Sequence, residues 1–318
     1  MQCMKSFLAA SLILMSAGTF GQTYPNKPIR VLVPFAAGSG TDILARIVTE
    51  EMRASMGASF VIDNRAGGSG QIAAELVARA NPDGYTILLS TNTPHSVNPF
   101  LFKKINYDPV KDFDAVARMI YYIFILVVNP NTNIKTVPEL IAYTKANPGK
   151  TSYAYGNGSG QVNAAYLVSA AKLDSLAVPY KSTPPAMTDL IAGQVQWMFV
   201  DAASSQGHVK AGRLRAIAVM SDKRSDIFPD LPGVGETVPG FDTVPWAGMF
   251  APAHTPKAIV SKLNTEIVKA INKPAINQRL ADLGLAPGPS TPAELDRFVK
   301  EQLQAWGKKI KDAGIQAE

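Results

Sequence analysis

From residue 28 onward the sequence alternates between short runs rich in β-branched residues and longer amphipathic stretches. The first pair is residues 29–35, which read as a buried strand, and residues 41–56, where apolar side chains recur at helical spacing. The alternation continues to about residue 220 and predicts an α/β fold of mostly parallel sheets flanked by helices. Further strands are expected at 60–62, 85–89, 120–128, 151–155, 176–180, 195–200, 214–220 and 246–251, and further helices at 71–80, 137–146, 161–172, 184–192, 204–211, 256–271, 274–283 and 292–313.

The series of strand–helix units is interrupted twice. A long β-branched and aromatic run covers residues 120–128, and an irregular segment rich in Pro and Gly covers residues 222–245. We interpret both as crossings of the chain between two lobes, with residues 24–122 and 245–318 in lobe 1 and residues 123–244 in lobe 2. Two crossings form a hinge, and a cleft between lobes is a usual place for a ligand. A single doubly wound domain is the alternative.

The N-terminal residues have the layout of a secretory signal peptide. Lys5 precedes a short apolar stretch at residues 7–15, and small residues follow up to Gly21. The apolar stretch is too short to span a bilayer, and a buried N-terminal helix is the alternative interpretation. We expect cleavage near Gly21, which removes residues 1–21 and exports the protein to the periplasm.

Composition excludes several classes of protein. The 318 residues contain one cysteine, Cys3, so neither a disulfide framework nor a cysteine-based zinc or iron–sulfur site is available. The 31 basic and 25 acidic side chains give a net charge of +6, which falls to +5 when Lys5 is removed with the signal peptide. Because the basic residues are scattered, we expect no nucleic-acid binding.

Three polar loops follow predicted strands, at residues 35–42, 90–94 and 155–161. In the first, Gly38 and Gly40 allow a tight turn and leave backbone N–H groups uncovered where the next helix begins. The positive end of a helix dipole suits a phosphate or a carboxylate, although each loop alone is also consistent with an ordinary capped turn. Because the first and third loops lie in different predicted lobes, together they predict an anion held between two helix starts.

Motifs for catalysis are incomplete. The glycines at 38 and 40 lack the third glycine of the dinucleotide-binding fingerprint, and no G-x-S-x-G nucleophile elbow occurs. The three histidines have no metal-ligand spacing, so we expect no metal, no cofactor and no enzymatic activity. Asp201 follows a predicted strand and has two readings, as the N-cap of the next helix or as an acceptor for a ligand's amino or hydroxyl group.

Long blocks of the sequence resemble a known family. YPNKPIRVLVPFAAGSGTDILAR at residues 24–46, VIDNRAGGSGQIAAELVARANPDGYTILL at 61–89 and WAGMFAPAHTPKAIVSKLN at 246–264 are similar to signature segments of the Bug-type, or TctC-like, receptors. These are periplasmic solute-binding receptors of tripartite tricarboxylate transporters. The resemblance runs from about residue 24 to the C-terminus.

The resemblance implies a two-lobed, Venus-flytrap receptor that closes on a carboxylated solute and presents it to membrane permease subunits, without catalysis. In this family the ligand's carboxylate is held largely by backbone amides and bridging waters. We expect the receptor to act as a monomer. Carried onto this sequence, the ligand-binding residues are Phe35, Ala37, Gly38, Ser39, Thr91, Asn92, Gly158, Ser159 and Asp201.

The sequence also departs from the family pattern at positions expected to contact the distal group of a ligand. Val162 and Asn163 stand where a histidine is frequent, Ser182 follows Lys181 where glycine is frequent, and Asp201 lies one residue later than the usual acid. The missing histidine and the aromatic residues near the lobe junction favour an aromatic or otherwise less polar carboxylate, with a dicarboxylate as the alternative. A ligand-responsive sensory receptor and a periplasmic enzyme acting on a carboxylated compound remain alternative functions.

Overall fold

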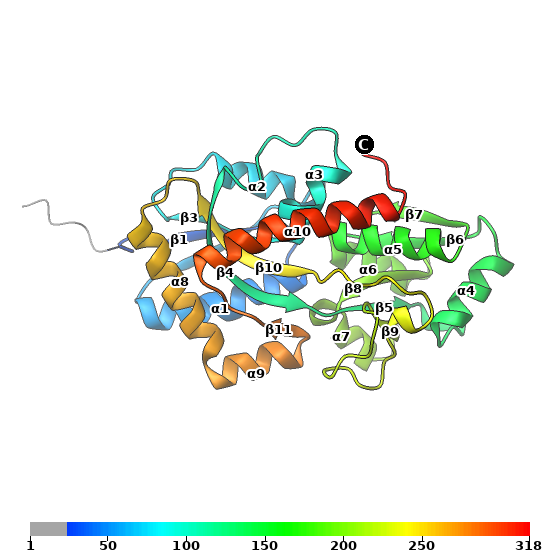
Figure 1. The fold of residues 1–318 in the computed structure, drawn as a ribbon. Coiled ribbons are helices and arrows are strands. Elements are labelled where there is room, and N and C mark those ends of the chain that lie inside the picture. Colours follow the sequence, from blue (N-terminus) through cyan, green and yellow to red (C-terminus); the bar gives the residue numbers. More distant parts are fainter. Residues whose placement is uncertain (1–23) are drawn as a thin grey trace, which may run out of the picture.

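The computed structural model describes residues 24–318 and shows two α/β lobes, each with a sheet covered by helices (Figure 1). This confirms the two-lobed fold class. The predicted signal peptide lies outside the described residues. Every helix in residues 24–318 is too short or too polar to span a bilayer.

Each lobe is organised around one sheet. In the first sheet the strand order is β11 (Leu285–Pro287), β4 (Phe113–Tyr122), β10 (Trp246–Pro252), β3 (Thr86–Thr91), β1 (Ile29–Val33) and β2 (Phe60–Asn64). In the second sheet the order is β7 (Ser175–Pro179), β6 (Thr151–Tyr155), β8 (Trp197–Asp201), β5 (Phe124–Val128) and β9 (Arg215–Val219).

Helices cover both faces of each sheet, so the central strands are apolar on both sides. In β1, Val31 and Val33 belong to the core beneath one set of helices, whereas Leu32 belongs to the core on the opposite face. This accounts for the near-continuous apolar run in the sequence. The helices are α1 (Gly40–Met56), α2 (Gln71–Ala78), α3 (Asn98–Leu101), α4 (Val137–Ala146), α5 (Gly158–Ala170), α6 (Thr183–Ile191), α7 (Ala202–Lys210), α8 (Lys257–Asn272), α9 (Pro274–Asp282) and α10 (Pro292–Asp312), with short turns η1 (Gly68–Gly70), η2 (Thr93–Val97), η3 (Pro130–Thr132) and η4 (Val234–Glu236).

In each sheet most strands point in one direction, as expected, and the remaining strands are antiparallel to them. Strands β1, β2 and β3 are parallel, as are β6, β7 and β8, but β10 runs antiparallel to β3 and β4, β11 to β4, and β5 to β8 and β9. Both β10 and β5 receive the chain from the other lobe. Each therefore starts beside the carboxyl end of its neighbour, β10 beside β3 and β5 beside β8, and runs in the opposite direction.

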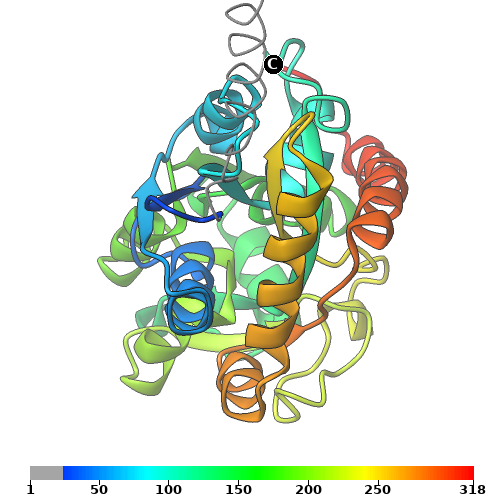
Figure 2. The same ribbon diagram turned by 90° about the vertical axis from the view of Figure 1, so that its left-hand side faces the viewer.

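The two sheets are joined near the two predicted crossings. The expected run 120–128 is divided at Ile123 into β4 and β5, which lie in different sheets. The return passes through the irregular segment between β9 and β10. Helix α10 spans the front of the molecule from β4 toward α5 (Figure 1). Helices α8 and α10 pack on opposite faces of the first sheet, and in Figure 2 α8 lies nearer the viewer and α10 at the right-hand edge.

Candidate functional site

The two lobes touch through polar groups at the carboxyl ends of their strands. Asn92 Nδ2, just after β3, donates to Ser159 Oγ of α5 at 2.8 Å. The Gly158 amide donates to Thr93 Oγ1 at 3.2 Å, and the Ala36 amide donates to Ser182 Oγ at 3.1 Å. These contacts join loops far apart in the sequence, so the structure represents a closed arrangement of the lobes.

Four helices begin around the same point. Helix α1 of the first lobe starts at Gly40, while α5, α6 and α7 of the second lobe start at Gly158, Thr183 and Ala202. Each start carries backbone N–H groups without an intrahelical acceptor and the positive end of a dipole. The predicted meeting of two helix starts is therefore found, with two more added by α6 and α7.

A small cavity lies among these helix starts. Its volume is about 20 Å³, which suits about one water molecule and is far too small for an organic acid. A larger ligand therefore requires the lobes to move apart before they close on it. The lining residues are Phe35, Ser39, Gly40, Thr41, Thr91, Asn92, Thr93, Tyr122, Phe124, Asn157, Ser159, Thr183 and Asp201.

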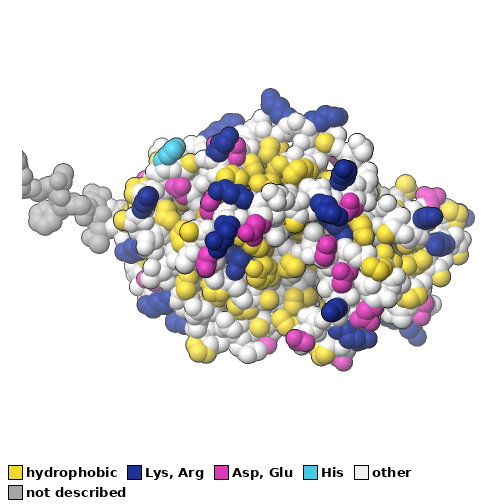
Figure 3. Space-filling model, viewed as in Figure 1, with side chains coloured by type: hydrophobic (Ala, Val, Ile, Leu, Met, Phe, Trp, Pro, Cys, Tyr) yellow, Lys and Arg dark blue, Asp and Glu magenta, His cyan; other side chains and the backbone are white. Residues whose placement is uncertain are grey.

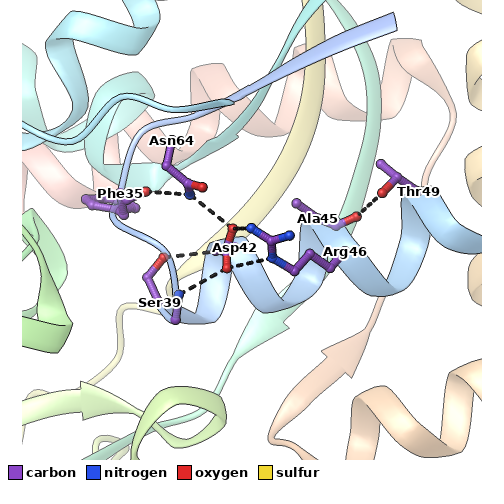
Figure 4. Close-up of polar contacts among 8 residues, drawn as sticks. Phe35, Ser39, Asp42, Ala45, Arg46, Thr49 and Asn64 are labelled. Carbon is purple, nitrogen blue, oxygen red and sulfur yellow. Dashed lines mark hydrogen bonds and ion pairs between the residues drawn. The ribbon is translucent and has the colours of Figure 1, made fainter. Parts of the chain in front are cut away.

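Asp42, in the first turn of α1, holds the first loop in place through hydrogen bonds to its carboxylate. Its carboxylate accepts hydrogen bonds from the Gly38 amide at 3.0 Å, from Asn64 Nδ2 at 3.1 Å and from the Arg46 guanidinium (Figure 4). Burial opposes ionisation of Asp42, but these hydrogen bonds and the Arg46 charge outweigh it and hold its pKa below the usual value. The Ser39 hydroxyl accepts from the Asp42 amide and caps α1.

Asp201 lies at a position that is compatible with both of its predicted roles, helix capping and ligand contact. Its Oδ1 accepts from the Ser204 amide at 2.9 Å and so caps α7, and the same carboxyl lines the cavity. The residue is 4% exposed. Burial raises the pKa of the Asp201 carboxyl, in opposition to the hydrogen bonds from Ser204. Capping is thus observed, whereas a ligand contact remains a hypothesis.

Six of the nine predicted ligand-binding residues line the cavity, and three do not. Ala37 and Gly38 are exposed on the first loop, and the Gly38 amide is already engaged by Asp42. Gly158 lies buried beside the cavity, where its amide bonds to Thr93. The six that line the cavity are Phe35, Ser39, Thr91, Asn92, Ser159 and Asp201.

Sequence reasoning missed several of the lining residues. Gly40, Thr41 and Asn157 lie inside the polar loops already singled out, and Tyr122 and Phe124 inside the aromatic run. Thr183 had only a weak signal: it is the first residue of α6 and precedes Pro184 and Pro185, a pattern typical of a helix start. Placing it in the site required the tertiary structure.

A larger hollow of about 600 Å³ lies on lobe 1. Residues of β4, α8 and the start of α10 line it, among them Phe113, Val260 and Asp296. Because they all belong to the first lobe, movement of the lobes would not open or close this hollow. Elsewhere on the face drawn in Figure 3, basic and acidic side chains are interspersed rather than gathered in one charged patch. The cleft is therefore the candidate functional site.

The fold and the interlobe cavity define a two-lobed solute-binding protein of the periplasmic type. Solved structures agree: periplasmic binding protein BugD is 34% identical with a TM-score of 0.88, covering 93% of this chain and 100% of its own. R. palustris Rpa4515 with adipate is 32% identical with a TM-score of 0.90 and the same coverage. MatC from Rhodopseudomonas palustris with bound malate is 32% identical with a TM-score of 0.85, covering 90% of this chain and 100% of its own.

The family follows from the sequence match. Residues 44–315 match the family described as the tripartite tricarboxylate transporter family receptor, TctC. The chain belongs to this family of periplasmic solute-binding receptors, which confirms the resemblance seen in the sequence.

Proposed function

We propose that this protein is an extracytoplasmic receptor that captures an organic carboxylate and delivers it to the membrane permease subunits of a tripartite tricarboxylate-type transporter. The observation that carries the proposal is the convergence of four helix starts on one interlobe cavity. Such a site binds an anion through backbone N–H groups without a basic side chain. The family description supports the delivery step.

The binding site in this proposal comprises the nine predicted residues together with Gly40, Thr41 and Thr183. Phe35, Ser39, Thr91, Asn92, Ser159 and Asp201 would contact the ligand from the cavity wall. Ala37, Gly38 and Gly158 would shape the loops that present the amides. The Gly40 and Thr41 N–H groups start α1 and have no intrahelical acceptor, so they are the first-lobe donors that we propose for the carboxylate.

The proposed ligand is an aromatic or dicarboxylic acid. Phe35 in the first loop and Tyr122 and Phe124 at the β4–β5 crossing provide apolar wall, which would pack against an aromatic or aliphatic body. Two solved relatives, each 32% identical, have adipate or malate in their structures, which supports a dicarboxylate.

We propose lobe limits at residues 24–122 with 245–318 and at residues 123–244. The division of strands between the two sheets supports these limits, because β5 to β9 all belong to the second sheet. In this proposal the signal peptide, residues 1–21, is cleaved near Gly21, and the receptor works in the periplasm as a monomer that binds without catalysis.

Thermal unfolding with a panel of acids tests the binding function. A ligand that binds only the folded state at 100 times its Kd adds about 2.7 kcal/mol of stability, a Tm increase of several degrees. The panel is adipate, malate, benzoate and phthalate, with adipamide as the uncharged control for adipate. We expect at least one acid, and not the diamide, to raise the Tm. No Tm shift with any acid of this panel would contradict the proposal.

A further inference from the structure

The ionisable side chains that line the cleft cavity are unusual for a site that binds an anion. Among the described residues that line it, none is Lys, Arg or His, and the one carboxyl is that of Asp201. A bound carboxylate would therefore share the closed cavity with an acidic side chain, with no cationic side chain in the cavity wall to separate them.

Asp201 also lies where the ligand's charge is expected. A Cβ added to Gly40 would be 2.3 Å from Asp201 Oδ1 and 3.3 Å from Oδ2, so this carboxyl of the second lobe packs directly against the start of α1. The α1 start is the proposed first-lobe donor to the ligand. The ligand's carboxylate and the Asp201 carboxyl would consequently occupy neighbouring positions.

Two carboxylates that share a buried site cannot both remain ionised at low cost. Like charges in close proximity raise the pKa of one member of the pair strongly, and a buried unpaired charge is expensive. A proton shared between the two groups removes the repulsion and provides a donor for a hydrogen bond between them.

On these grounds, and resting on the proposed function, we propose that Asp201 holds the ligand's carboxylate as a protonated acid that donates a hydrogen bond to it. Closure on an anionic ligand would then take up one proton from solvent. Asp201 would select ligands that present an acceptor at this end of the cavity, and it would reject those that present an ammonium group.

The groups around Asp201 are consistent with this role. Burial already raises its pKa without a ligand. On β4 the facing titratable group is the Tyr122 hydroxyl, whose pKa is raised by burial and by the nearby Asp201 and which bonds to Thr41 Oγ1 at 2.9 Å. On α1, Asp42 is paired with Arg46. The ionisable groups of α7 itself, His208 and Lys210, lie in its last turn, and Asp282 of α9 meets α7 through its carbonyl and Gln206.

An ammonium group at Asp201 is the competing interpretation, because an ionised Asp201 would pair with it. The positions of the helix starts disfavour this arrangement. The starts of α1 and α7 both adjoin the Asp201 carboxyl, and the positive ends of their dipoles repel a cation.

Proton linkage predicts the pH dependence. Opening of the lobes would bring water to the Asp201 carboxyl and remove much of the burial that raises its pKa, which favours the ionised form. The closed, liganded state binds one more proton, so affinity falls as pH rises. Above about pH 6.5, where simple carboxylic acids are ionised, the Kd should rise up to tenfold per pH unit, until the pH passes the pKa of the bound state.

The test is isothermal titration of the full mature protein with adipate, malate, benzoate and phthalate at pH 6.5, 7.5 and 8.5. Each titration is repeated in two buffers that are neither phosphate nor carboxylates and whose ionisation enthalpies differ, so that the heat reports the number of protons taken up. We expect about one proton per ligand. Asp201→Asn, which keeps an N-cap oxygen for α7, should take up none and should bind more tightly than wild type at pH 8.5. Asp230→Asn, at an exposed lobe-2 carboxylate, should behave as wild type.

Binding without proton uptake by the wild-type protein would overturn this inference alone, and that measurement does not depend on any variant. Loss of binding in Asp201→Asn with an unchanged circular dichroism spectrum would also overturn it, because Asp201 would then be an acceptor. If no acid binds at any pH, the proposed function fails, and this inference fails with it.

Discussion

Asn92 and Ser159 bond to each other across the cleft through both polar atoms of the amide. Asn92 Nδ2 donates to Ser159 Oγ at 2.8 Å, and the Ser159 hydroxyl donates to Asn92 Oδ1 at 3.2 Å. Asn92 follows β3 in the first sheet and Ser159 opens α5 beside the second. Both residues are buried, so this pair forms only when the lobes close and it contributes to the closed state.

Removing either partner should weaken ligand binding. Asn92→Ala and Ser159→Ala each leave a buried polar group without its partner, which costs about 1–3 kcal/mol. We expect the Kd to rise by roughly 5-fold to 100-fold in each variant. In a double-mutant cycle, the effect of the double variant should be smaller than the sum of the single effects by about 1 kcal/mol. Additive changes, measured by titration calorimetry, would show that the two side chains do not act as a pair.

Gly158 keeps the lobes close together because it has no side chain. A Cβ at this position would lie 2.7 Å from Val97 Cγ1 and 3.0 Å from Thr93 Cγ2, both in the other lobe. Overpacking of this kind costs about 1–3 kcal/mol, here paid only on closure. Gly158→Ala should therefore raise the Kd about tenfold or more and increase the radius of gyration in small-angle scattering with ligand present. Gly207→Ala, where a Cβ meets nothing within 4 Å, is the control and should bind as wild type.

The sequence predicted most elements of this fold because local patterns determine them. The helix at residues 137–146 and the strand at 151–155 agree with α4 and β6 to the residue, since Thr136 caps the helix and its Glu139 follows at the expected spacing. The third loop was expected to extend to residue 161, but α5 begins at Gly158. Two glycines in its first turn lower the helix propensity, and the Asn157 side chain caps the helix by accepting from the Gly160 amide.

Other features depended on contacts that no local pattern records. Strand β11 has three residues and exists through its pairing with β4. The π-helical turn η2 was expected only as the polar loop 90–94, because its apolar contacts come from distant residues: His95 stacks on Phe250 at 3.9 Å. The helix starts of α1 and α5 were predicted to meet, but the position of Thr183 in the same site depends on how the second lobe packs.

Lys309 of α10 attaches the C-terminal helix to the second lobe. Its ammonium lies 3.2 Å from the centroid of the Tyr166 ring on α5 and donates to the Gly240 carbonyl. Because the Lys309 side chain is only 5% exposed, Lys309→Ala removes buried stem packing as well as the ammonium contacts. We expect a loss of about 2–3 kcal/mol in the free energy of unfolding by urea.

Lys308→Ala is the matched control on the same helix. The Lys308 side chain is 77% exposed and pairs only with Asp312 among the contacts of the described residues, and exposed pairs contribute less than about 1 kcal/mol. Equal losses in the two variants would show that the contact between α10 and α5 does not stabilise the fold.

Asp42 makes stability depend on pH in the acid range. Its pKa is lowered in the folded state because hydrogen bonds from Arg46, Gly38 and Asn64 outweigh the cost of burial. The folded state therefore binds this proton less tightly than the unfolded chain does, whose Asp pKa is about 3.9. The resulting stabilisation is fully present above the unfolded value and is lost as pH falls through the folded one.

Asp42→Asn should remove this contribution and keep the shape of the side chain. We expect the variant to be less stable than wild type by about 1–2 kcal/mol at pH 7, with the difference decreasing below about pH 4. Urea unfolding at pH 7, 5 and 3 measures it, and Asp230→Asn should show no difference at any of the three. Because Asp42 holds the Gly38 amide in the first loop, the variant should also bind the ligand more weakly at pH 7. A constant difference in stability from pH 7 to pH 3 would mean that Asp42 acts through its shape and not through its charge.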